Sequence, residues 1–347
     1  MSAALRSLFA PADRPDVYII AEAGVNHDGS VPAAHDLVEL AAATGADAVK
    51  FQTFDPSALV SASARTAAYQ AATTGIESQR ELLEQYVLPA SAWPELRDHA
   101  VELGIDFLST AFDLGSLDLV CELGVAALKL GSGELTNMPL LREAARRGLP
   151  VIASTGMATE REVADAVEWL AAASGLLLLH CVSSYPAPVE QANLRAIETL
   201  RRRFGVPVGW SDHTVGATTA VAAVALGAAA LEKHVTRDRA RPGPDHAASA
   251  DEAAMRDYVA QARAAQSALG DGTKQPVPAE QDTAVLVRRS WHAARDLPSG
   301  TRLDSADLLL LRPATGIAPA VELTGRVLSR DLAAGEAIAT ADLVDGQ

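Results

Sequence analysis

Cysteines, lysines and aromatic residues are rare in this sequence, and it contains no long apolar segment. Only Cys121 and Cys181 occur among 347 residues, both inside apolar stretches. Two cysteines without a CxxC pair do not make a disulfide scaffold, so we expect two buried thiols. No apolar run approaches the ~20 residues that span a membrane. The N-terminal segment lacks the apolar core and cleavage site of an export signal, which predicts a cytoplasmic location.

Positive charge is also scarce, since 44 acidic residues outnumber 29 basic ones and the net charge is −15 at pH 7. This balance argues against nucleic acid and anionic membranes as partners. Arginine supplies all but four of the basic residues, and the four lysines are Lys50, Lys129, Lys233 and Lys274. This chain uses arginine where any surface cation is sufficient. The few lysines are therefore expected where a compact ammonium group is needed.

Short β-type segments alternate with longer helical patterns between residues 17 and 268. Eight such repeats over roughly 250 residues predict a (β/α)8 barrel. A doubly wound open sheet is the main alternative, and the absence of a glycine-rich dinucleotide fingerprint after the first strand weakens it. The predicted strands are 17–23, 48–53, 106–110, 127–132, 150–155, 176–182, 207–212 and 230–235.

Helical spacing is clearest in four segments that each finish in a glycine, a common helix C-cap: 31–45, 88–104, 140–148 and 160–175. Polar residues gather at the carboxyl ends of the predicted strands. In a barrel these ends converge on one mouth, where the active site lies, whereas an open sheet would string them along an edge. The residues are Glu22, Lys50, Gln52, Ser109, Thr110, Lys129, Ser154, Thr155, His180, Ser211, Asp212, Lys233 and His234.

The composition changes after residue 268. Residues 270–284 are rich in glycine, proline and polar residues, which is typical of a linker. Residues 285–347 contain short β-like pieces at 291–297, 308–314 and 326–332 between turns, which predict a small, mostly β domain. We therefore divide the chain into a barrel of residues 1–269, the linker, and a C-terminal domain. About 60 residues form only a marginal core, so we expect this domain to dock onto a barrel.

Three lysines, Lys50, Lys129 and Lys233, lie near the ends of the second, fourth and eighth predicted strands among apolar residues. An ammonium group in such a position needs an anionic partner. One interpretation pairs each lysine with a carboxylate; those available are Glu22, Glu134 and Glu232. The other is a cradle for phosphate and carboxylate groups, helped by hydroxyl groups. The hydroxyl candidates are Thr110, Ser132, Ser154 and Ser211.

Two histidines, His213 and His234, end the seventh and eighth predicted strands beside Asp212. A single histidine is more often a satisfied core group than a ligand. Neighbouring strands lie about 5 Å apart, however, so two imidazoles at adjacent strand ends can share one ion. Two imidazoles with water and substrate oxygens suit Mn²⁺, Fe²⁺, Co²⁺ or Zn²⁺ better than Mg²⁺. Such an open site predicts an ion that acts as a Lewis acid on a carbonyl.

Three carboxylates complete the candidate set. Glu22 lies inside an apolar strand, and Asp245 lies in a Pro/Gly-rich loop after the last strand, where loops overhang the mouth. We expect Glu22 and Asp245 to bind sugar hydroxyls and Glu134 to move a proton. For each of the three a solvated surface position is the alternative, and it fits Glu22 least because Glu22 lies inside an apolar strand.

Nine strings between residues 21 and 249 stand in the order and spacing of one protein family: AEAGVNHDG (21–29), VKFQTF (49–54), LSTAFD (108–113), LKLGSGE (128–134), ASTGM (153–157), HCVSSYPAP (180–188), WSDHT (210–214), LEKHVT (231–236) and RPGPDHAAS (241–249). Through them the sequence resembles the sialic acid (nonulosonic acid) synthase family over essentially its whole length. RRSWHAARDL (288–297) and LRPATGI (311–317) resemble the family's C-terminal antifreeze-like (SAF) domain. The resemblance implies a metal-dependent condensation of phosphoenolpyruvate with an open-chain amino-sugar aldehyde.

The resemblance also implies roles for individual residues. The implied catalytic residues are Glu22, Glu134, His213 and His234, and the two histidines hold a divalent ion, usually Mn²⁺, with Mg²⁺ or Co²⁺ as alternatives. The implied phosphoenolpyruvate site is Lys50, Thr110, Lys129, Ser132, Ser154, Ser183 and Ser211. The implied sugar site is Glu22, Gln52, Tyr185 and Asp245, with Arg312 supplied by the partner subunit of a homodimer whose C-terminal domain covers the partner's active site.

One residue departs from the family pattern. Members that make N-acetylneuraminate often have asparagine in the HC-x-N-x-Y segment, where this chain has Ser183. Relatives that make legionaminic or pseudaminic acid resemble the serine version more closely. The acceptor is therefore open between N-acetylmannosamine and a 2,4-diacetamido-trideoxyhexose. Two other hypotheses are condensation with a different aldehyde in a natural-product pathway and a non-catalytic sugar-binding barrel.

Overall fold

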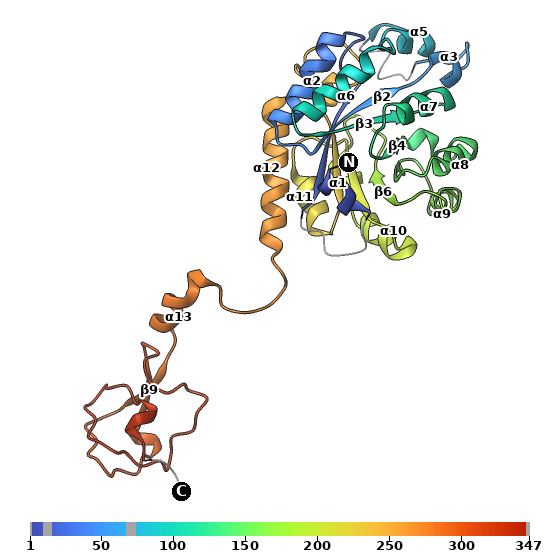
Figure 1. Cartoon of the computed structure of the whole chain (residues 1–347). Helices are drawn as coiled ribbons and strands as arrows, with labels where there is room; N and C mark the ends of the chain where they lie inside the picture. The colour runs from blue at the N-terminus through green and yellow to red at the C-terminus, as the bar shows by residue number, and fades with distance from the viewer. Residues whose placement is uncertain (1, 10–15, 67–73, 345–347) are drawn as a thin grey trace. The chain divides into compact units, whose positions relative to one another are not determined.

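A computed structural model describes residues 2–9, 16–66 and 74–344 (Figure 1). Residues 1–270 form one compact unit, and residues 271–347 form a second, which we describe separately. No helix within these described ranges is long and apolar enough to cross a membrane. Cys181 is buried as expected, whereas Cys121 is only half-buried, and both thiols are free.

Eight parallel strands close into a barrel in chain order, which confirms the (β/α)8 prediction and excludes the open sheet. All eight predicted strands are present, with ends that differ by one or two residues. Their bounds are β1 (Tyr18–Gly24), β2 (Ala48–Thr53), β3 (Asp106–Ala111), β4 (Leu128–Leu130), β5 (Val151–Ser154), β6 (Leu176–Cys181), β7 (Val208–Asp212) and β8 (Ala230–His234).

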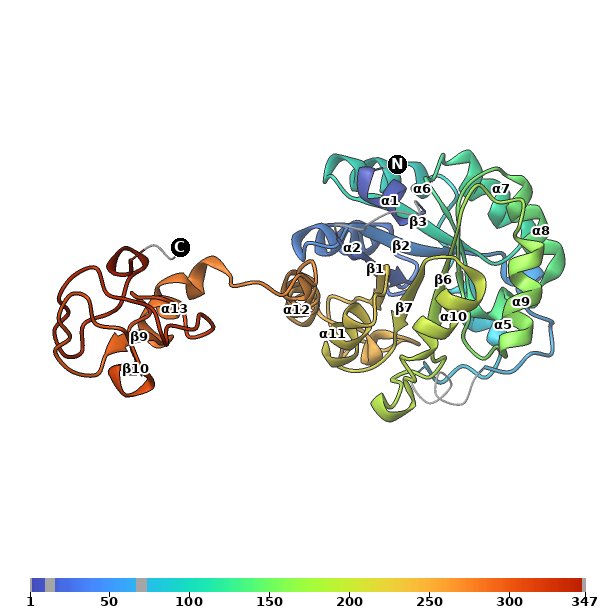
Figure 2. The ribbon, with the colours of Figure 1, turned by 90° about the horizontal axis from the view of Figure 1, so that it is seen from below.

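Helices surround the strands on the outside of the barrel (Figure 2). Gly45, Gly104 and Gly148 follow α2, α6 and α8 with φ of 82°, 79° and 72°, so these three predicted caps are confirmed. Gly175 lies beyond the end of α9 and caps nothing. The helices are α1 (Ala3–Leu8), α2 (Val31–Ala43), α3 (Pro56–Leu59), α5 (Gln79–Glu84), α6 (Ala92–Glu102), α7 (Leu114–Glu122), α8 (Met138–Arg146), α9 (Glu160–Trp169), α10 (Ala196–Phe204), α11 (Thr218–Ala225) and α12 (Glu252–Leu269).

The barrel interior is apolar at one end and polar at the other. Alternate residues of a strand share one face, so each strand sends an apolar residue and then a polar one inward. At the amino ends these side chains form an apolar cluster, closed by Leu5 and Leu8 of α1. The cluster takes Tyr18, Ile20, Ala48, Leu108, Ile152, Leu177, Leu179 and Ala230 from the strands. Two residues further along each strand, the interior becomes polar.

The second unit contains α13 (Gln281–Val287) and an antiparallel pair, β9 (Ser290–Ala293) and β10 (Leu308–Leu311). Helix α13 begins inside the predicted linker, which is therefore not wholly irregular. The predicted strand at 326–332 is wrong, because this segment makes only isolated bridges from Val327, Leu328 and Leu332. Its bridges go to three different partners, Arg302, Leu343 and Leu297, so no continuous ladder forms. Nine buried apolar residues, including Leu303 and Leu323, give the unit its own core.

Candidate active site

A cavity of about 310 Å³ at the carboxyl ends of the strands brings together most of the predicted site residues. A cavity of about 390 Å³ beside it contains only Gln52 of the predicted set, so the chemistry favours the smaller one. The predicted residues that line the smaller cavity are Glu22, Lys50, Gln52, Thr110, Lys129, Ser132, Ser154, Ser183, Tyr185, Ser211, His213 and His234.

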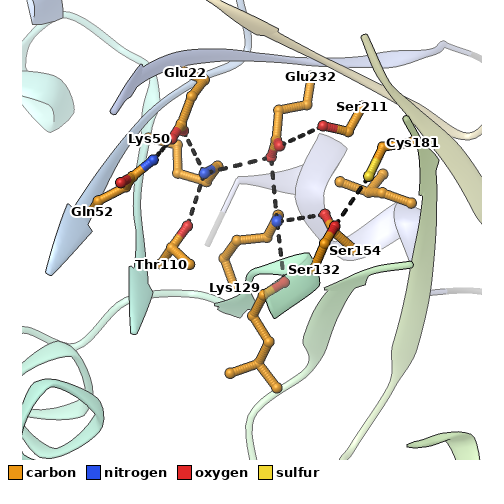
Figure 3. A network of polar contacts seen from close by, with 12 residues as sticks. Glu22, Lys50, Gln52, Thr110, Lys129, Ser132, Ser154, Cys181, Ser211 and Glu232 are labelled. Carbon is orange, nitrogen blue, oxygen red and sulfur yellow. Dashed lines mark hydrogen bonds and ion pairs between the residues drawn. The ribbon is translucent and has the colours of Figure 1, made fainter. Parts of the chain in front are cut away.

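Two buried lysines share one glutamate at the floor of this cavity (Figure 3). The Oε2 atom of Glu232 lies 3.7 Å from the Nζ atom of Lys50 and 3.8 Å from that of Lys129. Ser211 donates a hydrogen bond of 3.0 Å to the other carboxylate oxygen of Glu232. Burial opposes ionisation of Glu232, but the two ammonium groups and the hydroxyl outweigh it and lower its pKa to about 2.

Glu22 forms a second ion pair with Lys50 and accepts a hydrogen bond of 3.1 Å from the Nε2 atom of Gln52. Burial raises the pKa of Glu22 to about 7, although Lys50 opposes the shift. Lys50 also donates to the Thr110 hydroxyl at 2.8 Å. With Glu22 protonated, two ammonium groups face the single charge of Glu232, and the cavity has a positive charge available for an anion.

Serine hydroxyls line the side of the cavity next to Lys129. The Lys129 ammonium group donates to the Ser154 hydroxyl at 2.7 Å, and the Ser132 hydroxyl contacts the Cys181 thiol at 3.1 Å. Burial lowers the pKa of Lys129, and the charge of Glu232 opposes this effect. An entering phosphate or carboxylate would therefore meet both a cation and hydroxyl donors, which together favour an anion.

The two imidazoles lie side by side at the rim, with ring centroids 5.5 Å apart. His213 donates from Nδ1 to the Val182 carbonyl at 2.7 Å, which leaves its Nε2 lone pair free for a ligand. Tyr185 packs on His213 with centroids 4.2 Å apart. Burial lowers the pKa of both histidines, so each ring is neutral at pH 7.

These neutral rings fit a divalent ion. The buried Nδ1 atom of His234 makes no hydrogen bond, so the protein does not otherwise fix the tautomer of this ring. No group of three or more His, Cys, Asp or Glu side chains within residues 2–9, 16–66 and 74–344 is arranged to hold an ion. An ion on these two rings would therefore take its other ligands from water and substrate, as an open site requires.

Comparisons with known proteins identify the family of the chain. The NeuB family model matches residues 37–274, and the SAF domain model matches residues 288–344. The chain belongs to the NeuB family. It is 45% identical to an N,N'-diacetyllegionaminic acid synthase of Legionella pneumophila over 92% of each chain. It is 42% identical to the synthase of the same name from Campylobacter jejuni, over 92% of this chain and 98% of that one. The crystal structure of an N-acetylneuraminic acid synthetase from Leptospira borgpetersenii superposes with a TM-score of 0.67 at 34% identity, over 77% and 90% of the two chains.

Lys233 does not belong to the cavity of this NeuB-family barrel, so its predicted place in the anion cradle is wrong. Glu232 and His234 both point inward, and strand alternation therefore turns Lys233 outward. Its ammonium group lies 3.6 Å from Asp212, which also faces away from the cavity. Lys50 and Lys129 occupy inward positions and line the cavity.

Seven other predicted residues lie outside the cavity lining. Ser109, Thr155, His180 and Asp212 were expected at the mouth, but each lies next to an inward-facing residue, so strand alternation turns it away. The remaining three are Glu134, Asp245 and Arg312. Glu134 is half-buried and accepts a hydrogen bond of 2.7 Å from Asn137. Asp245 is buried in the loop after β8, where burial raises its pKa to about 6 and neighbouring His246 opposes the shift. Arg312 is exposed and follows β10 in the second unit. The roles of these three residues stay predictions.

Glu232 was considered only as a partner for a lysine, yet it connects the whole cation cluster. Strand alternation is the signal that could have found it. Glu232 precedes His234 by two residues on the same strand, so the two side chains must share a face. Placing His234 in the site therefore requires Glu232 to be there as well.

Gly156 provides a test of the serine hydroxyls that line the cavity next to Lys129. A Cβ atom at this position would lie 2.4 Å from the Ser183 hydroxyl, 2.7 Å from the Cys181 sulfur and 2.9 Å from the Ser132 hydroxyl. We expect Gly156→Ala to raise the KM for phosphoenolpyruvate about tenfold, because a displaced hydroxyl forfeits about one hydrogen bond. Gly133→Ala is the matched control, since Gly133 lines the same cavity with nothing within 4 Å of its added Cβ. Steady-state kinetics and melting temperatures check both variants, and an unchanged KM in Gly156→Ala would contradict the prediction.

Proposed function

We propose that this chain condenses phosphoenolpyruvate with an open-chain N-acylated amino-hexose, giving a nine-carbon 2-keto sugar acid and inorganic phosphate. The observation that carries this proposal is the buried Lys50–Glu232–Lys129 cluster beside two neutral imidazoles in one barrel mouth. Phosphoenolpyruvate brings two anionic groups on a small molecule, which suits a cluster with two ammonium groups. Family membership and the names of the similar synthases support the same reaction.

In the proposed mechanism, Lys50 and Lys129 bind the carboxylate and phosphate, and the hydroxyl groups of Thr110, Ser132 and Ser154 complete the hydrogen bonds. These contacts aim C3 of phosphoenolpyruvate at the sugar's C1. A divalent ion held by His213 and His234, Mn²⁺ by preference with Mg²⁺ or Co²⁺ as alternatives, would polarise the aldehyde carbonyl as a Lewis acid.

Formation of the C3–C1 bond leaves C2 of the former phosphoenolpyruvate electron-poor. The ionised Glu232 lies where it can stabilise positive charge at this carbon. As the C3–C1 bond forms, Glu22, protonated when phosphoenolpyruvate binds, gives its proton to the C1 oxygen. Water then adds at C2, and the Glu22 carboxylate, with a pKa of about 7, takes the proton that this water loses. The C2–O bond to phosphate breaks, the phosphate leaves with the bonding electrons and takes up the proton of the C2 hydroxyl, and C2 becomes the ketone of the product.

We propose a 2,4-diacetamido-trideoxyhexose as the acceptor, in preference to N-acetylmannosamine. Two relatives above 40% identity are N,N'-diacetyllegionaminic acid synthases, and Ser183 lies in the cavity where an asparagine is expected for N-acetylneuraminate synthesis. Phosphate release across a panel of amino-hexoses, with product masses, tests this proposal. Phosphate release only with an unrelated aldehyde would show that the proposed class of acceptor is wrong. No release with any acceptor in the presence of Mn²⁺ would favour a non-catalytic barrel.

We expect the Glu22 carboxylate to take up a proton when phosphoenolpyruvate binds. The anion adds negative charge beside Lys50 and Glu22, which raises the pKa of Glu22 further above about 7. At about pH 7.5 the free enzyme holds Glu22 mostly ionised, so binding should take up part of one proton. Calorimetry in buffers of different ionisation enthalpy measures this uptake. The difference between wild type and Glu22→Gln isolates Glu22 from the titration of the ligand's own phosphate, and no difference would contradict the prediction.

We also propose a homodimer in the cytoplasm, in which Arg312 of the partner subunit contacts the sugar. Arg312→Ala is expected to lower activity without lowering the melting temperature, because the side chain is exposed within its own unit. Coexpression of Arg312→Ala chains with His213→Ala chains tests the arrangement. If Arg312 acts across the dimer, mixed dimers regain about half of the active sites. If it acts within its own chain, every mixed dimer stays as impaired as its parents.

A further inference from the structure

A buried ion pair lies behind the two imidazoles, on the side of the barrel wall that faces away from the cavity. Asp212 and Lys233 are direct register partners on β7 and β8. Their side chains are 0% and 4% exposed, and the Oδ1 and Nζ atoms lie 3.6 Å apart. In β8 the neighbours of Lys233 are Glu232 and His234, both of which point into the cavity.

This ion pair holds the turn that carries His213. Asp212 accepts hydrogen bonds from the backbone N–H and the hydroxyl of Thr214, both at 2.8 Å, and from the Thr219 hydroxyl at 2.9 Å. The Lys233 ammonium group donates to the Thr214 carbonyl. The residue directly after His213 is therefore fixed through its amide, its carbonyl and its side chain.

The two imidazoles depend on this turn to different degrees. His234 is the last residue of β8, so the parallel ladder with β1 fixes its backbone. His213 lies one residue beyond the end of β7, where no strand ladder holds it. Its ring contacts Val182 through a hydrogen bond and stacks on Tyr185, and its carbonyl accepts a hydrogen bond of 2.8 Å from the Ala187 amide. The backbone of His213 is therefore held on one side by this loop contact and on the other by the bonds that hold its neighbour Thr214.

Both members of the pair are almost fully buried. Thr214 is 1% exposed, and the Lys233 ammonium group lies 5.3 Å from the centre of the buried Tyr258 ring on α12. A buried ammonium group over an aromatic ring, with a single carboxylate opposite, is held in one geometry. Neither Asp212 nor Lys233 lines the cavity, so neither can contact substrate there.

We propose that Asp212 and Lys233 are positioning residues that fix the distance between His213 and His234 and thereby set the affinity of the two rings for a divalent ion. This inference rests on the proposed metal site. Groups that orient metal ligands typically change metal affinity 10–100-fold when they are removed. The anion cradle should be less affected, because Lys50 and Lys129 lie on β2 and β4.

The test compares the full-length, EDTA-treated wild type with Lys233→Met and with the double variant Asp212→Asn/Lys233→Met. The double variant removes both charges and leaves no unpaired buried ion. It therefore keeps the test possible if the single variant does not fold. Titration with Mn²⁺ and, separately, with phosphoenolpyruvate gives two dissociation constants for each protein. We expect Mn²⁺ affinity to fall about 10–100-fold in both variants, with phosphoenolpyruvate affinity changed less than about threefold.

Asp47→Asn is the matched control, because Asp47 forms a partly buried ion pair with Arg263 at 2.6 Å, just before β2. It should lower the melting temperature and leave Mn²⁺ affinity unchanged. Unchanged Mn²⁺ affinity in the double variant, or an equal loss of Mn²⁺ and phosphoenolpyruvate binding, would overturn the positioning role. Wild type that binds no Mn²⁺ would overturn the proposed metal site itself, which is a different result.

Discussion

Replacing His234 with alanine is expected to lower kcat at least about 1,000-fold while leaving the fold and phosphoenolpyruvate binding nearly intact. A Lewis acid on a carbonyl contributes several kcal/mol to transition-state stabilisation, and each 1.36 kcal/mol is about tenfold in rate. His213→Ala should have a similar effect, because an ion held by two protein ligands does not remain bound to one. Phosphate release under saturating Mn²⁺ measures kcat, and calorimetry measures phosphoenolpyruvate affinity.

His180 supplies the matched control for these variants. It precedes Cys181, which lines the cavity, so it lies on the opposite face of β6. There it packs on Trp210 with centroids 5.1 Å apart and contacts the Ala192 carbonyl. His180→Ala should therefore cost stability and leave kcat within about threefold of wild type. Full turnover of EDTA-treated wild type would contradict the metal role, whatever the variants do.

Replacing Lys129 with methionine is expected to lower kcat/KM for phosphoenolpyruvate about 100- to 1,000-fold. The ammonium group contacts the Ser154 hydroxyl at 2.7 Å and Glu232 at 3.8 Å, and it would donate directly to the ligand's anion. Truncating one partner of a buried charged contact costs about 2–5 kcal/mol of binding free energy. We expect a loss of about 3–4 kcal/mol here, which corresponds to the stated fall in kcat/KM. Initial rates over a range of phosphoenolpyruvate concentrations measure the effect.

Two further substitutions interpret this result. Lys274→Met removes an exposed ammonium group of the second unit and should change nothing. Lys129→Arg should recover little activity, because the guanidinium group is larger and planar, and the site around Lys129 is closed. If Lys274→Met and Lys129→Met gave the same kinetics, the anion cradle would have to lie elsewhere.

Strand alternation decided which of the predicted site residues face the common cavity. Lys50, Lys129 and His234 were placed in the site because they end predicted strands, and the structure brings them together. Lys233 satisfied the same criterion and was wrong, because its neighbour His234 occupies the inward position. The criterion recognises the end of a strand but not its face, and a shift of one residue exchanges the two faces.

Residues beyond the strand ends were harder to place for a different reason. Glu134 and Asp245 were selected as carboxylates that follow the fourth and eighth predicted strands, and neither lines the cavity. No strand ladder determines the direction of a loop side chain; local hydrogen bonds do, as Asn137 does for Glu134. The predicted strand at 326–332 failed similarly, because whether a short β-like segment joins a ladder depends on the strands that it meets.

The sequence by itself determined the (β/α)8 architecture, the scarcity of lysine outside the strand ends and the set of side chains available for anion and metal binding. These are local properties, set by hydrophobic periodicity and by residue chemistry. Only the tertiary structure decided that Glu232 joins Lys50 and Lys129 and that Lys233 instead pairs with Asp212 behind the imidazoles. The physical reason is that closing the barrel fixes the register of neighbouring strands, and this register selects which face of each strand is turned toward the common cavity.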